Sequence, residues 1–247
     1  MNFIKSLFSK PNTPSMEPNV ETTKVNFVSE TVITPVDSTT VEEQFPANVE
    51  NSEEFNMANK EYLYTAPEIS GWFSEEEQLL AFQTLLNFYS VQHSILDIGC
   101  GRGDLLNLLL KVNPNISYTG IDYNPNLISL AKEKFPSGRF EVAEFPVVQY
   151  APESFDWVFA SAIFNQINDR NDQFTYAKQC IDKMFELCKL GVAFNLMYKA
   201  PDVSKEELDT LYVHDIGEWC KYLTDTYSKT CMYCDYINGD VTFFISK

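Results

Sequence analysis

The segment Ile-Leu-Asp-Ile-Gly-Cys-Gly-Arg-Gly-Asp-Leu-Leu, residues 95–106, joins a strand pattern to the start of a helix through three alternate glycines. Its first residues are mostly apolar, as in a buried strand, and leucines recur after the last glycine, as in a helix. Glycine lets the backbone turn tightly and approach a ligand closely, because it has no Cβ atom. The unpaired N–H groups at the start of the helix suit a carboxylate or phosphate, so the turn predicts a site for a ligand with an anionic end.

Strand and helix patterns alternate from residue 62 to the end of the 247-residue chain. We expect strands at 94–98, 117–122, 140–143, 155–161 and 191–197, and helices at 104–112, 125–135, 172–189 and 215–227. Another helix is expected to begin at the capping box 74–77, with Leu79, Phe82, Leu86 and Tyr89 on its apolar face. An Asn-Gly turn at 238–239 predicts a hairpin of strands 230–236 and 241–246. The pattern predicts an α/β fold with five parallel strands, a terminal antiparallel pair, and helices on both faces of the sheet.

The first 60 residues differ in composition from the rest of the chain. Residues 11–56 contain five prolines and neither Tyr nor Trp. Such a segment buries too little apolar surface to offset the entropy lost on ordering. We therefore expect residues 1–60 to form a tail that is disordered or docked on a protein partner through Phe3, Ile4, Leu7 and Phe8, and residues 61–247 to form one domain.

Charge and cysteine content narrow the function classes. The net charge of −17 disfavours nucleic acid and anionic lipid as partners, because both are polyanions. No apolar run approaches the roughly 20 residues that a membrane span needs, so we expect no membrane segment. Six cysteines are scattered through the predicted elements, which indicates a reducing, cytoplasmic environment: Cys100, Cys180, Cys188, Cys220, Cys231 and Cys234. The Cys231–Cys234 pair has no partner pair, so no metal site is expected.

Two aspartates refine the expected ligand. Asp122 follows Gly103 by 19 residues and ends the second predicted strand, where a carboxylate can accept hydrogen bonds from both ribose hydroxyls of a nucleoside. Asp97 stands two residues before the first glycine of the turn, where it would repel a pyrophosphate but suit an amino group or a sulfonium. Asp104 occupies the place at which the nicotinamide-dinucleotide pattern requires glycine. A nicotinamide dehydrogenase is therefore disfavoured.

Residues 97–103 resemble the first motif of the class I S-adenosylmethionine-dependent methyltransferases. The likeness continues in order through residues 120–125 (Gly-Ile-Asp-Tyr-Asn-Pro), 142–145 (Val-Ala-Glu-Phe) and 155–161 (Phe-Asp-Trp-Val-Phe-Ala-Ser), and it covers about residues 62–247. It implies a Rossmann-like sheet of seven strands and S-adenosylmethionine as cofactor. A further likeness at residues 71–74, with Gln78 and Phe82 and with Asp235-Tyr236 near the end of the chain, resembles a branch of small methyltransferases found in bacteria and tailed bacteriophages.

The resemblance also implies residue roles. In this family the glycine turn cradles the methionine part of the cofactor, the acid at Asp122 holds the ribose, and the next residue, Tyr123, packs on adenine. Glu144 stands where an Asp commonly receives the adenine amino group. Trp72 and Gln78 would close over the cofactor, although Trp72 suits equally a packing role before the capped helix. The implied cofactor-binding set is Trp72, Gln78, Asp97, Gly99, Cys100, Gly101, Gly103, Asp122, Tyr123, Glu144, Phe145 and Ser161.

Methyl transfer from a sulfonium is an in-line displacement, so no metal or acid–base pair is obligatory. His214 is the candidate base, with a surface or helix-flanking position as the alternative. Asn165 follows the fourth predicted strand, where it would face the acceptor or cap a turn. The chain lacks the Pro-Pro-Tyr and Pro-Cys motifs of DNA methyltransferases. A small molecule or a protein is therefore the expected acceptor.

Two functions remain open at this point. The first is an active S-adenosylmethionine-dependent methyltransferase. The second is a structural or scaffolding subunit that keeps the methyltransferase fold and is anchored by residues 1–60 in a larger assembly, such as a virus particle.

Overall fold

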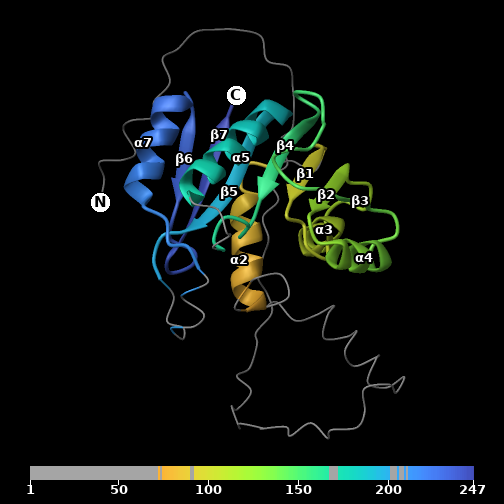
Figure 1. Ribbon diagram of the computed structural model, residues 1–247. Helices are drawn as coiled ribbons and strands as arrows, with labels where there is room; N and C mark the ends of the chain where they lie inside the picture. Colours follow the sequence, from red (N-terminus) through yellow and green to blue (C-terminus); the bar gives the residue numbers. More distant parts are fainter. Residues whose placement is uncertain are drawn as a thin grey trace, which may run out of the picture. The chain divides into compact units, whose positions relative to one another are not determined.

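The structure is a computed structural model that describes residues 72, 74–89, 92–166, 172–200, 205, 209 and 211–247. The tail predicted for residues 1–60 lies outside the described residues. In chain order the elements are α2 (Glu75–Leu85), β1 (Ile95–Ile98), α3 (Asp104–Leu110), β2 (Tyr118–Asp122), α4 (Pro125–Lys134), β3 (Arg139–Val142), β4 (Phe155–Ala160), α5 (Gln173–Leu187), β5 (Cys188–Met197), α7 (Ile216–Thr226), β6 (Thr230–Tyr233) and β7 (Asp240–Ser246) (Figure 1).

One sheet contains all the named strands, in the spatial order β3-β2-β1-β4-β5-β7-β6. Strands β1 to β5 pair in parallel, whereas β7 runs antiparallel to both β5 and β6. This confirms the predicted seven-stranded, mostly parallel sheet. Strand β1 lies between β2 and β4, so the chain winds outward in both directions from this point. Open α/β sheets bind ligands in the crevice beyond the carboxyl ends of the strands at such a switch point.

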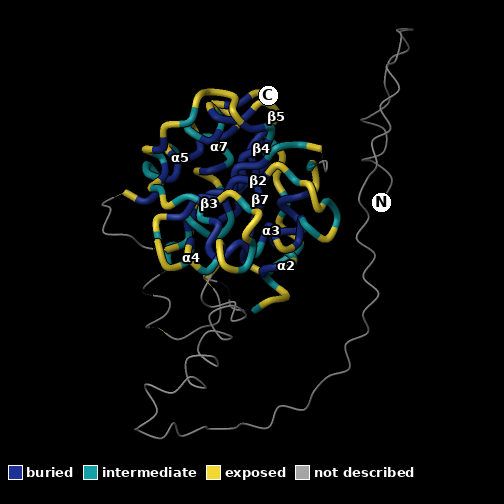
Figure 2. The backbone as a smooth tube through the Cα atoms, turned by 90° about the vertical axis from the view of Figure 1, so that its right-hand side faces the viewer, coloured by how far each residue is buried: buried dark blue, intermediate teal, exposed yellow. Residues whose placement is uncertain are grey.

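Helices cover both faces of the sheet, as predicted. Buried side chains of α5 and α7 form one core layer with Leu96 and Ile98 of β1. Helices α2, α3 and α4 form the other core layer, which includes Ile95. The alternation follows from the period of two along a strand, which sends successive side chains to opposite faces. Figure 2 shows the result, with buried backbone at the centre and exposed positions on the outer surfaces of the helices.

Helix α2 begins as predicted but buries a different stripe. The Ser74 hydroxyl accepts a 3.2 Å hydrogen bond from the Glu77 N–H, which is the expected cap. Leu79, predicted for the apolar face, is 43% exposed. The helix contacts β5 and β7, and its buried residues are Gln78, Ala81, Phe82, Thr84 and Leu85. The prediction of Leu79 in the core is therefore wrong, because contact with the sheet selects a stripe centred near Phe82.

The end of the predicted helix 172–189 is also wrong. Helix α5 ends at Leu187, and Cys188 begins β5 at once. Cys188 pairs with Phe155 at the start of β4, and the register shifts before Trp157 pairs with Gly191. This strand pairing takes the last predicted helical residues into the sheet. The chain therefore enters β5 without an intervening loop, and the Cys188 side chain is buried.

The terminal hairpin has the predicted antiparallel pairing and turn. Gly239, in the Asn-Gly pair, has a φ of +94°, a left-handed conformation that favours glycine. Strand β6 is shorter than predicted and ends at Tyr233. Within the described part of the chain, no helix is long and apolar enough to cross a membrane. All six cysteines are free thiols.

Candidate cofactor-binding site

A cleft of about 760 Å³ lies beyond the carboxyl ends of β1, β2, β3 and β4. Its wall includes the predicted residues Trp72, Gln78, Asp97, Gly99, Cys100, Gly101, Asp122, Tyr123, Glu144, Phe145 and Ser161. The residues of five separate sequence segments therefore come together in one place. The volume falls within the range of about 300–1,000 Å³ that is typical of small-molecule sites.

Gly103 does not line this cleft, although it belongs to the predicted set. Its φ of +85° is left-handed, and it forms the N-cap of α3. A Cβ atom on Gly103 would lie 3.0 to 3.1 Å from ring atoms of Phe135 and Phe140. The structure therefore gives Gly103 a packing role, in which the glycine lets α3 sit against the core.

The first glycine of the turn brings two loops together. Gly99 has a φ of +69°, and a Cβ atom on it would lie 2.2 Å from Cγ2 of Ile163. Ile163 belongs to the loop after β4 and also lines the cleft. The N–H groups of Gly99 and Cys100 both donate to the Ile121 carbonyl, at 2.8 and 3.0 Å. The turn is thus held between β2 and the loop after β4.

Asp122 supports the same turn from the end of β2. Its Oδ2 accepts a 3.0 Å hydrogen bond from the Gly101 N–H, and its Oδ1 accepts a 2.8 Å bond from the Asn124 N–H. Burial raises the pKa of Asp122, while the two backbone hydrogen bonds act in the opposite direction. An ionised carboxylate has about four acceptor positions, so these two bonds leave capacity for a ligand's hydroxyl groups.

Asp97 places an uncompensated carboxylate in the cleft wall. Its side chain is buried, and its Oδ2 accepts a 2.5 Å hydrogen bond from the Tyr118 hydroxyl. Burial raises the pKa of Asp97 to about 7; the Tyr118 hydrogen bond lowers it, and the charges of Asp122 and Asp104 raise it further. A cationic group of a ligand would relieve this accumulation of negative charge.

Asp104 is a cleft residue that sequence reasoning did not assign to the site. Its carboxylate pairs with Arg102 Nε at 2.9 Å and with Lys134 Nζ at 3.2 Å. Gln78 Nε2 also donates to Asp104 Oδ2, at 3.3 Å. This last bond ties α2 to the start of α3, and so places Gln78 at the cleft. The acid stands inside the glycine segment, and this was the signal that could have identified it.

The rim near the ends of β2 and β3 offers exposed apolar surface. Tyr123 is 74% exposed and Val142 is 53% exposed, and both line the cleft together with Leu127. Large apolar side chains with this exposure suit the flat face of an aromatic ligand ring. Glu144 and Phe145 follow β3 at the same rim. Val142 belongs to the 142–145 motif but was not assigned a contact, and Leu127 lies outside the motifs, so neither was predicted to line the site.

The loop after β4 forms the opposite side of the cleft. The Ser161 hydroxyl is buried and has no hydrogen-bond partner among the described residues. Ala162 has a φ of +60°, and its N–H donates a 2.7 Å hydrogen bond to Asn195 Oδ1. Gln166 and Tyr176 complete this wall, and neither was predicted. A cofactor or acceptor that hydrogen-bonds Ser161 would satisfy its hydroxyl.

His214 lies outside the cleft. Its Nε2 lies 3.0 Å from the Phe164 carbonyl, which can only accept, and its Nδ1 accepts a 3.0 Å hydrogen bond from Trp219 Nε1. These bonds define a neutral imidazole with its proton on Nε2, and burial lowers its pKa to about 4. The surface position considered for His214 is wrong, because the ring is buried. Both nitrogens are used within the core, so we do not include His214 as a base in the proposed site.

The hydrogen bonds of Asn165 have the predicted turn-stabilising geometry, and the residue also lines a smaller pocket beside the cleft. Its Oδ1 accepts a 2.8 Å hydrogen bond from the Met197 N–H at the end of β5, and its carbonyl accepts one of 2.7 Å from the Tyr212 N–H. Asn165 therefore joins the loop after β4 to the chain beyond β5. It does not line the large cleft.

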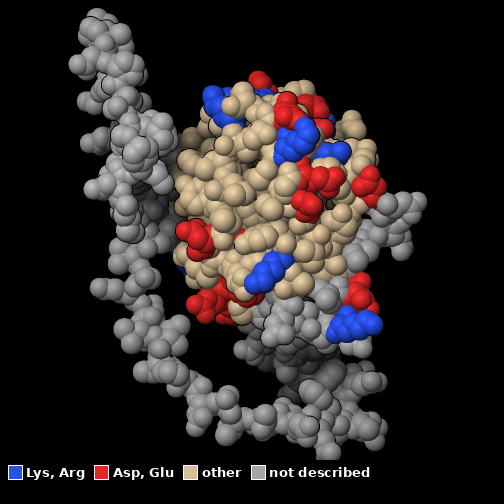
Figure 3. All heavy atoms as spheres, turned by 90° about the vertical axis from the view of Figure 1, so that its left-hand side faces the viewer, with Lys and Arg blue, Asp and Glu red and all other residues tan. Residues whose placement is uncertain are grey.

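The described residues contain no metal site, and their charged surface is mixed. Cys231 and Cys234 are exposed, and no group of three or more His, Cys, Asp or Glu side chains in the described residues could hold a metal ion. On the face that bears α7 and β6, lysine and arginine side chains are scattered beside acidic and uncharged surface (Figure 3).

The fold and the motif-bearing cleft agree with a comparison of the sequence with protein families. A family described as a methyltransferase domain matches residues 90–242. The chain belongs to the class I S-adenosylmethionine-dependent methyltransferases. The match spans the glycine turn, all strands from β1 to β6 and the start of β7.

Individual relatives differ in how much of their length they share with this chain. A putative methyltransferase of Mycobacterium tuberculosis is 30% identical over 160 residues, which cover 62% of this chain and 93% of the relative. Malonyl-[acyl-carrier protein] O-methyltransferase 1 of Ilyobacter polytropus is 34% identical over 95 residues, but these cover only 37% of this chain and 35% of that protein. This chain thus matches about a third of the length of such relatives.

The fold is shared with solved methyltransferase structures. The plantazolicin methyltransferase in complex with SAH superposes with a TM-score of 0.52 at 18% identity, over 78% of this chain and 88% of that chain. At this level of identity the likeness establishes the fold. Members of this family use S-adenosylmethionine as their cofactor, so the fit of the cleft to this molecule is the relevant question.

Proposed function

We propose that this protein transfers the methyl group of S-adenosylmethionine to a small-molecule or protein acceptor. The observation that carries the proposal is the placement of Asp97 and Asp122, on neighbouring strands, in one cleft beside the glycine turn. These two carboxylates match the two parts of the cofactor that differ most in chemistry, its cationic amino acid end and its ribose diol.

The hydrogen-bond acceptors and apolar side chains of the cleft fit this cofactor. Asp97 would accept from the amino group, because it is buried and its one hydrogen-bond donor in the described part of the chain is the neutral Tyr118 hydroxyl. Asp122 would accept from the ribose hydroxyls with the positions that its backbone hydrogen bonds leave free. Tyr123 and Val142 would pack on the adenine ring, and Glu144 would receive its amino group. When bound, S-adenosylmethionine supplies an electrophilic methyl group attached to a sulfonium.

The protein contributes alignment and exclusion of water. The glycine turn, fixed by Asp122 and by Ile163, provides a rigid floor against which a ligand is held. Holding two reactants in line can account for about 7–11 kcal/mol of a reaction barrier. The loop after β4, with Ser161 and Ala162, would face the acceptor. These residues supply position rather than acid–base chemistry in the proposal.

The names of the relatives indicate the breadth of acceptors that this fold serves. One relative is named for an acceptor linked to an acyl-carrier protein, and one structural neighbour is named for plantazolicin. Acceptor residues in this fold lie on loops that vary while the sheet stays constant. The scaffolding alternative depends on residues 1–60, which lie outside the described residues, and no described contact favours it.

Calorimetric titration of the full chain with S-adenosylmethionine tests the proposal. We expect stoichiometric binding, and we expect Asp122→Ala to weaken it at least tenfold, because the variant loses both the ribose contact and the support of Gly101. Asp235→Ala is the matched control, since it removes an exposed carboxylate outside the cleft. Absence of binding by the intact, folded protein would overturn the proposal.

A further inference from the structure

A second, smaller pocket adjoins the large cleft. Its volume is about 60 Å³. It is lined by Trp72, Glu77, Ala162, Asn165, Met197, Ile237, Gly239 and Asp240. Trp72 and Ala162 line both cavities, so the small pocket, called the side pocket below, lies next to the cleft beside the loop after β4. A water molecule occupies about 30 Å³ of liquid, so the side pocket admits only a head group of a few heavy atoms.

Asp240 is fixed at this pocket by two hydrogen bonds to one oxygen. Its Oδ2 accepts from Asn195 Nδ2 and from the Tyr236 hydroxyl, each at 2.9 Å. The Tyr236 oxygen also lies 2.7 Å from Thr242 Oγ1. Since the tyrosine proton is donated to the carboxylate, the threonine hydroxyl donates to Tyr236. The Asp240 side chain is thereby locked by residues of β5 and of the terminal hairpin.

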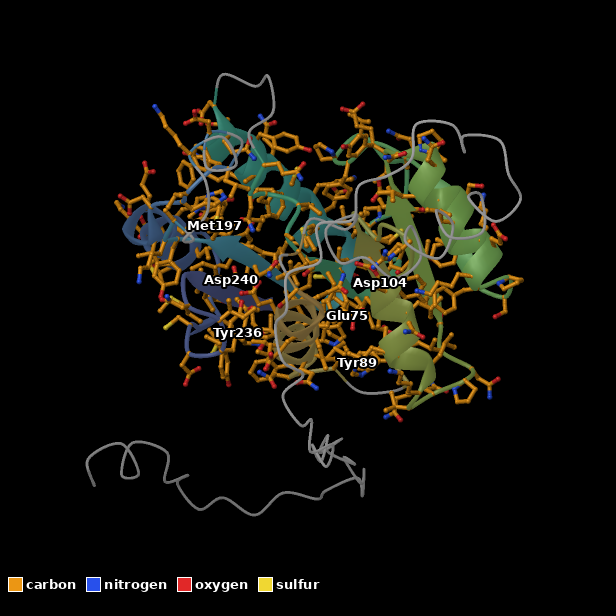
Figure 4. All side chains as sticks on the ribbon, turned by 90° about the horizontal axis from the view of Figure 1, so that it is seen from below. Glu75, Tyr89, Asp104, Met197, Tyr236 and Asp240 are labelled. Atoms are coloured by element: carbon orange, nitrogen blue, oxygen red, sulfur yellow. The ribbon has the colours of Figure 1, made fainter. Side chains whose placement is uncertain are left out.

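The other oxygen of Asp240 meets no donor at full hydrogen-bond geometry, although the neighbouring Val241 N–H lies close enough to the carboxylate to lower its pKa. Asp240 is only 7% exposed, and its Oδ1 is buried with no hydrogen-bond partner among the described residues. A buried carboxylate oxygen without a donor costs on the order of 1–3 kcal/mol or more, so proteins rarely leave one without a function. Figure 4 labels Asp240 beside Tyr236 and Met197, where β5 ends and β7 begins.

The pocket carries negative charge. Burial raises the pKa of Asp240 to about 7, while hydrogen bonds from Tyr236, Asn195 and the Val241 backbone N–H lower it. Glu77 of α2 also lines the pocket, and its charge raises this pKa further. No lysine or arginine is among the described residues that line the pocket. Trp72 adds an aromatic wall, and indole rings attract cations.

We propose that this side pocket binds a primary ammonium group of the methyl acceptor, with Oδ1 of Asp240 as the hydrogen-bond acceptor and Glu77 as a second negative charge. Two carboxylates, one aromatic ring and a volume that fits a small head group together select a compact cation. The rest of the acceptor would pass Ala162 into the cleft. Asp240 thus acts as a specificity-determining residue, and the identification of the cation's carrier as the acceptor rests on the proposed methyltransferase function.

The occupied pocket would also be connected to the cofactor cleft. Asn195 donates to Asp240 through Nδ2 and accepts the Ala162 N–H through Oδ1, at 2.7 Å. Ala162 is held in a left-handed conformation, with a φ of +60°, next to the unpartnered hydroxyl of Ser161. A single amide side chain therefore links the acceptor's anchoring point to the loop that faces the cofactor.

Ligand-observed NMR on the full chain, with and without SAH, tests this inference with three matched probes: n-butylammonium, n-butanol and n-butyrate. We expect n-butylammonium to bind at least tenfold more tightly than n-butanol, and n-butyrate not to bind. Asp240→Asn should weaken n-butylammonium binding at least tenfold. Asp235→Asn, which removes the same charge from an exposed site in the same hairpin, should leave it unchanged.

Several results would overturn the inference: equal binding of n-butanol and n-butylammonium, preference for n-butyrate, or unchanged n-butylammonium binding by folded Asp240→Asn. If Asp240→Asn fails to fold by circular dichroism, Glu77→Gln replaces it, with a loss of at least threefold expected and an unchanged affinity contradicting the inference. Calorimetry with S-adenosylmethionine is run in parallel. Loss of cofactor binding in the wild-type chain would overturn the proposed function, while the ammonium measurement without SAH would still decide the pocket's specificity.

Discussion

The Tyr118 hydroxyl donates a 2.5 Å hydrogen bond to Asp97 Oδ2 and thereby joins β1 and β2 at the cleft. Both side chains are buried, and burial raises the pKa of Tyr118 well above its usual value. Tyr118 therefore remains a neutral donor. It orients the Asp97 carboxylate without neutralising it, which leaves the charge of Asp97 available to a cationic ligand.

Asp97→Asn is expected to weaken S-adenosylmethionine binding at least tenfold, equivalent to about 1.4 kcal/mol, because it removes the negative charge but keeps the shape. Calorimetry at pH 8 measures this, since Asp97, with a pKa of about 7, is then mostly ionised. Asp235→Asn serves as the control for net charge. An unchanged affinity in folded Asp97→Asn would remove Asp97 from the cofactor site.

The free energy of unfolding of the ligand-free protein should depend on pH through three buried groups. The pKa values of Asp97 and Asp240 rise from an ordinary 3.8 to about 7 in the folded state, so the stability that each contributes below pH 4 is lost as the pH rises toward 7. His214 has the opposite sign, because burial lowers its pKa from 6.5 to about 4, and its contribution is lost as the pH falls through this range.

Two aspartates outweigh one histidine, so the contribution of these groups to stability falls between pH 4.5 and 6.5. Asp97→Asn should flatten the decline by at most about 3 kcal/mol, and a His214→Phe variant should make it steeper. Urea denaturation at four pH values between 4.5 and 7.5 measures both effects. An identical pH profile for Asp97→Asn and the wild type would show that Asp97 titrates normally in the folded protein.

Gly99→Ala is expected to destabilise the fold by about 2–4 kcal/mol. Part of the loss comes from the left-handed backbone, at a φ of +69°, and part from the approach of the new methyl group to Ile163 Cγ2. Ile163→Ala removes the second part, so a double-mutant cycle in urea should give a favourable coupling of about 1–2 kcal/mol. Additive effects would mean that the loop after β4 moves away without cost.

His214→Phe is expected to lower stability by about 1–3 kcal/mol at pH 7, because it leaves the Trp219 N–H buried without its acceptor. The Phe164 carbonyl loses the His214 donor but keeps the 3.0 Å hydrogen bond from Gln173 Nε2. Its affinity for S-adenosylmethionine, measured by calorimetry below the unfolding transition, should stay within twofold of the wild-type value. A large loss of affinity in the folded variant would instead connect His214 to the cleft.

Local patterns predicted most of the fold because local chemistry determines it. The capping box begins α2 through Ser74, and the glycine turn and Asn-Gly pair stand where the chain needs left-handed residues. The errors arise where tertiary contact overrides periodicity. Leu79 has helical spacing but points away from the sheet, and Cys188 continues a helical pattern but pairs with Phe155.

Some residues of the candidate site could likewise be predicted from local sequence motifs, and others could not. Asp97 and Asp122 were predictable because each stands at the end of a strand within a motif. Gln166 and Tyr176 reach the cleft only because the sheet brings distant segments together, and neither has a local signal. Asp240 follows a hairpin turn and looks like an ordinary turn residue in the sequence. Only the structure shows that its carboxylate is buried beside Glu77 and Trp72.

Trp72 provides the last test, because the chain has three tryptophans and only this one lines the cleft. All three are buried, but Trp157 and Trp219 lie away from the cleft, whereas Trp72 lines it and its ring meets Phe82 edge-on at 6.4 Å. Binding of S-adenosylmethionine should therefore change the intrinsic fluorescence, and Trp72→Phe should abolish the change while calorimetry still detects binding. Trp157→Phe, the matched control, should lower the total emission but keep the change. A change that persists in Trp72→Phe would leave Trp72 with its packing role alone, as a residue that fixes the start of α2 without contacting the cofactor.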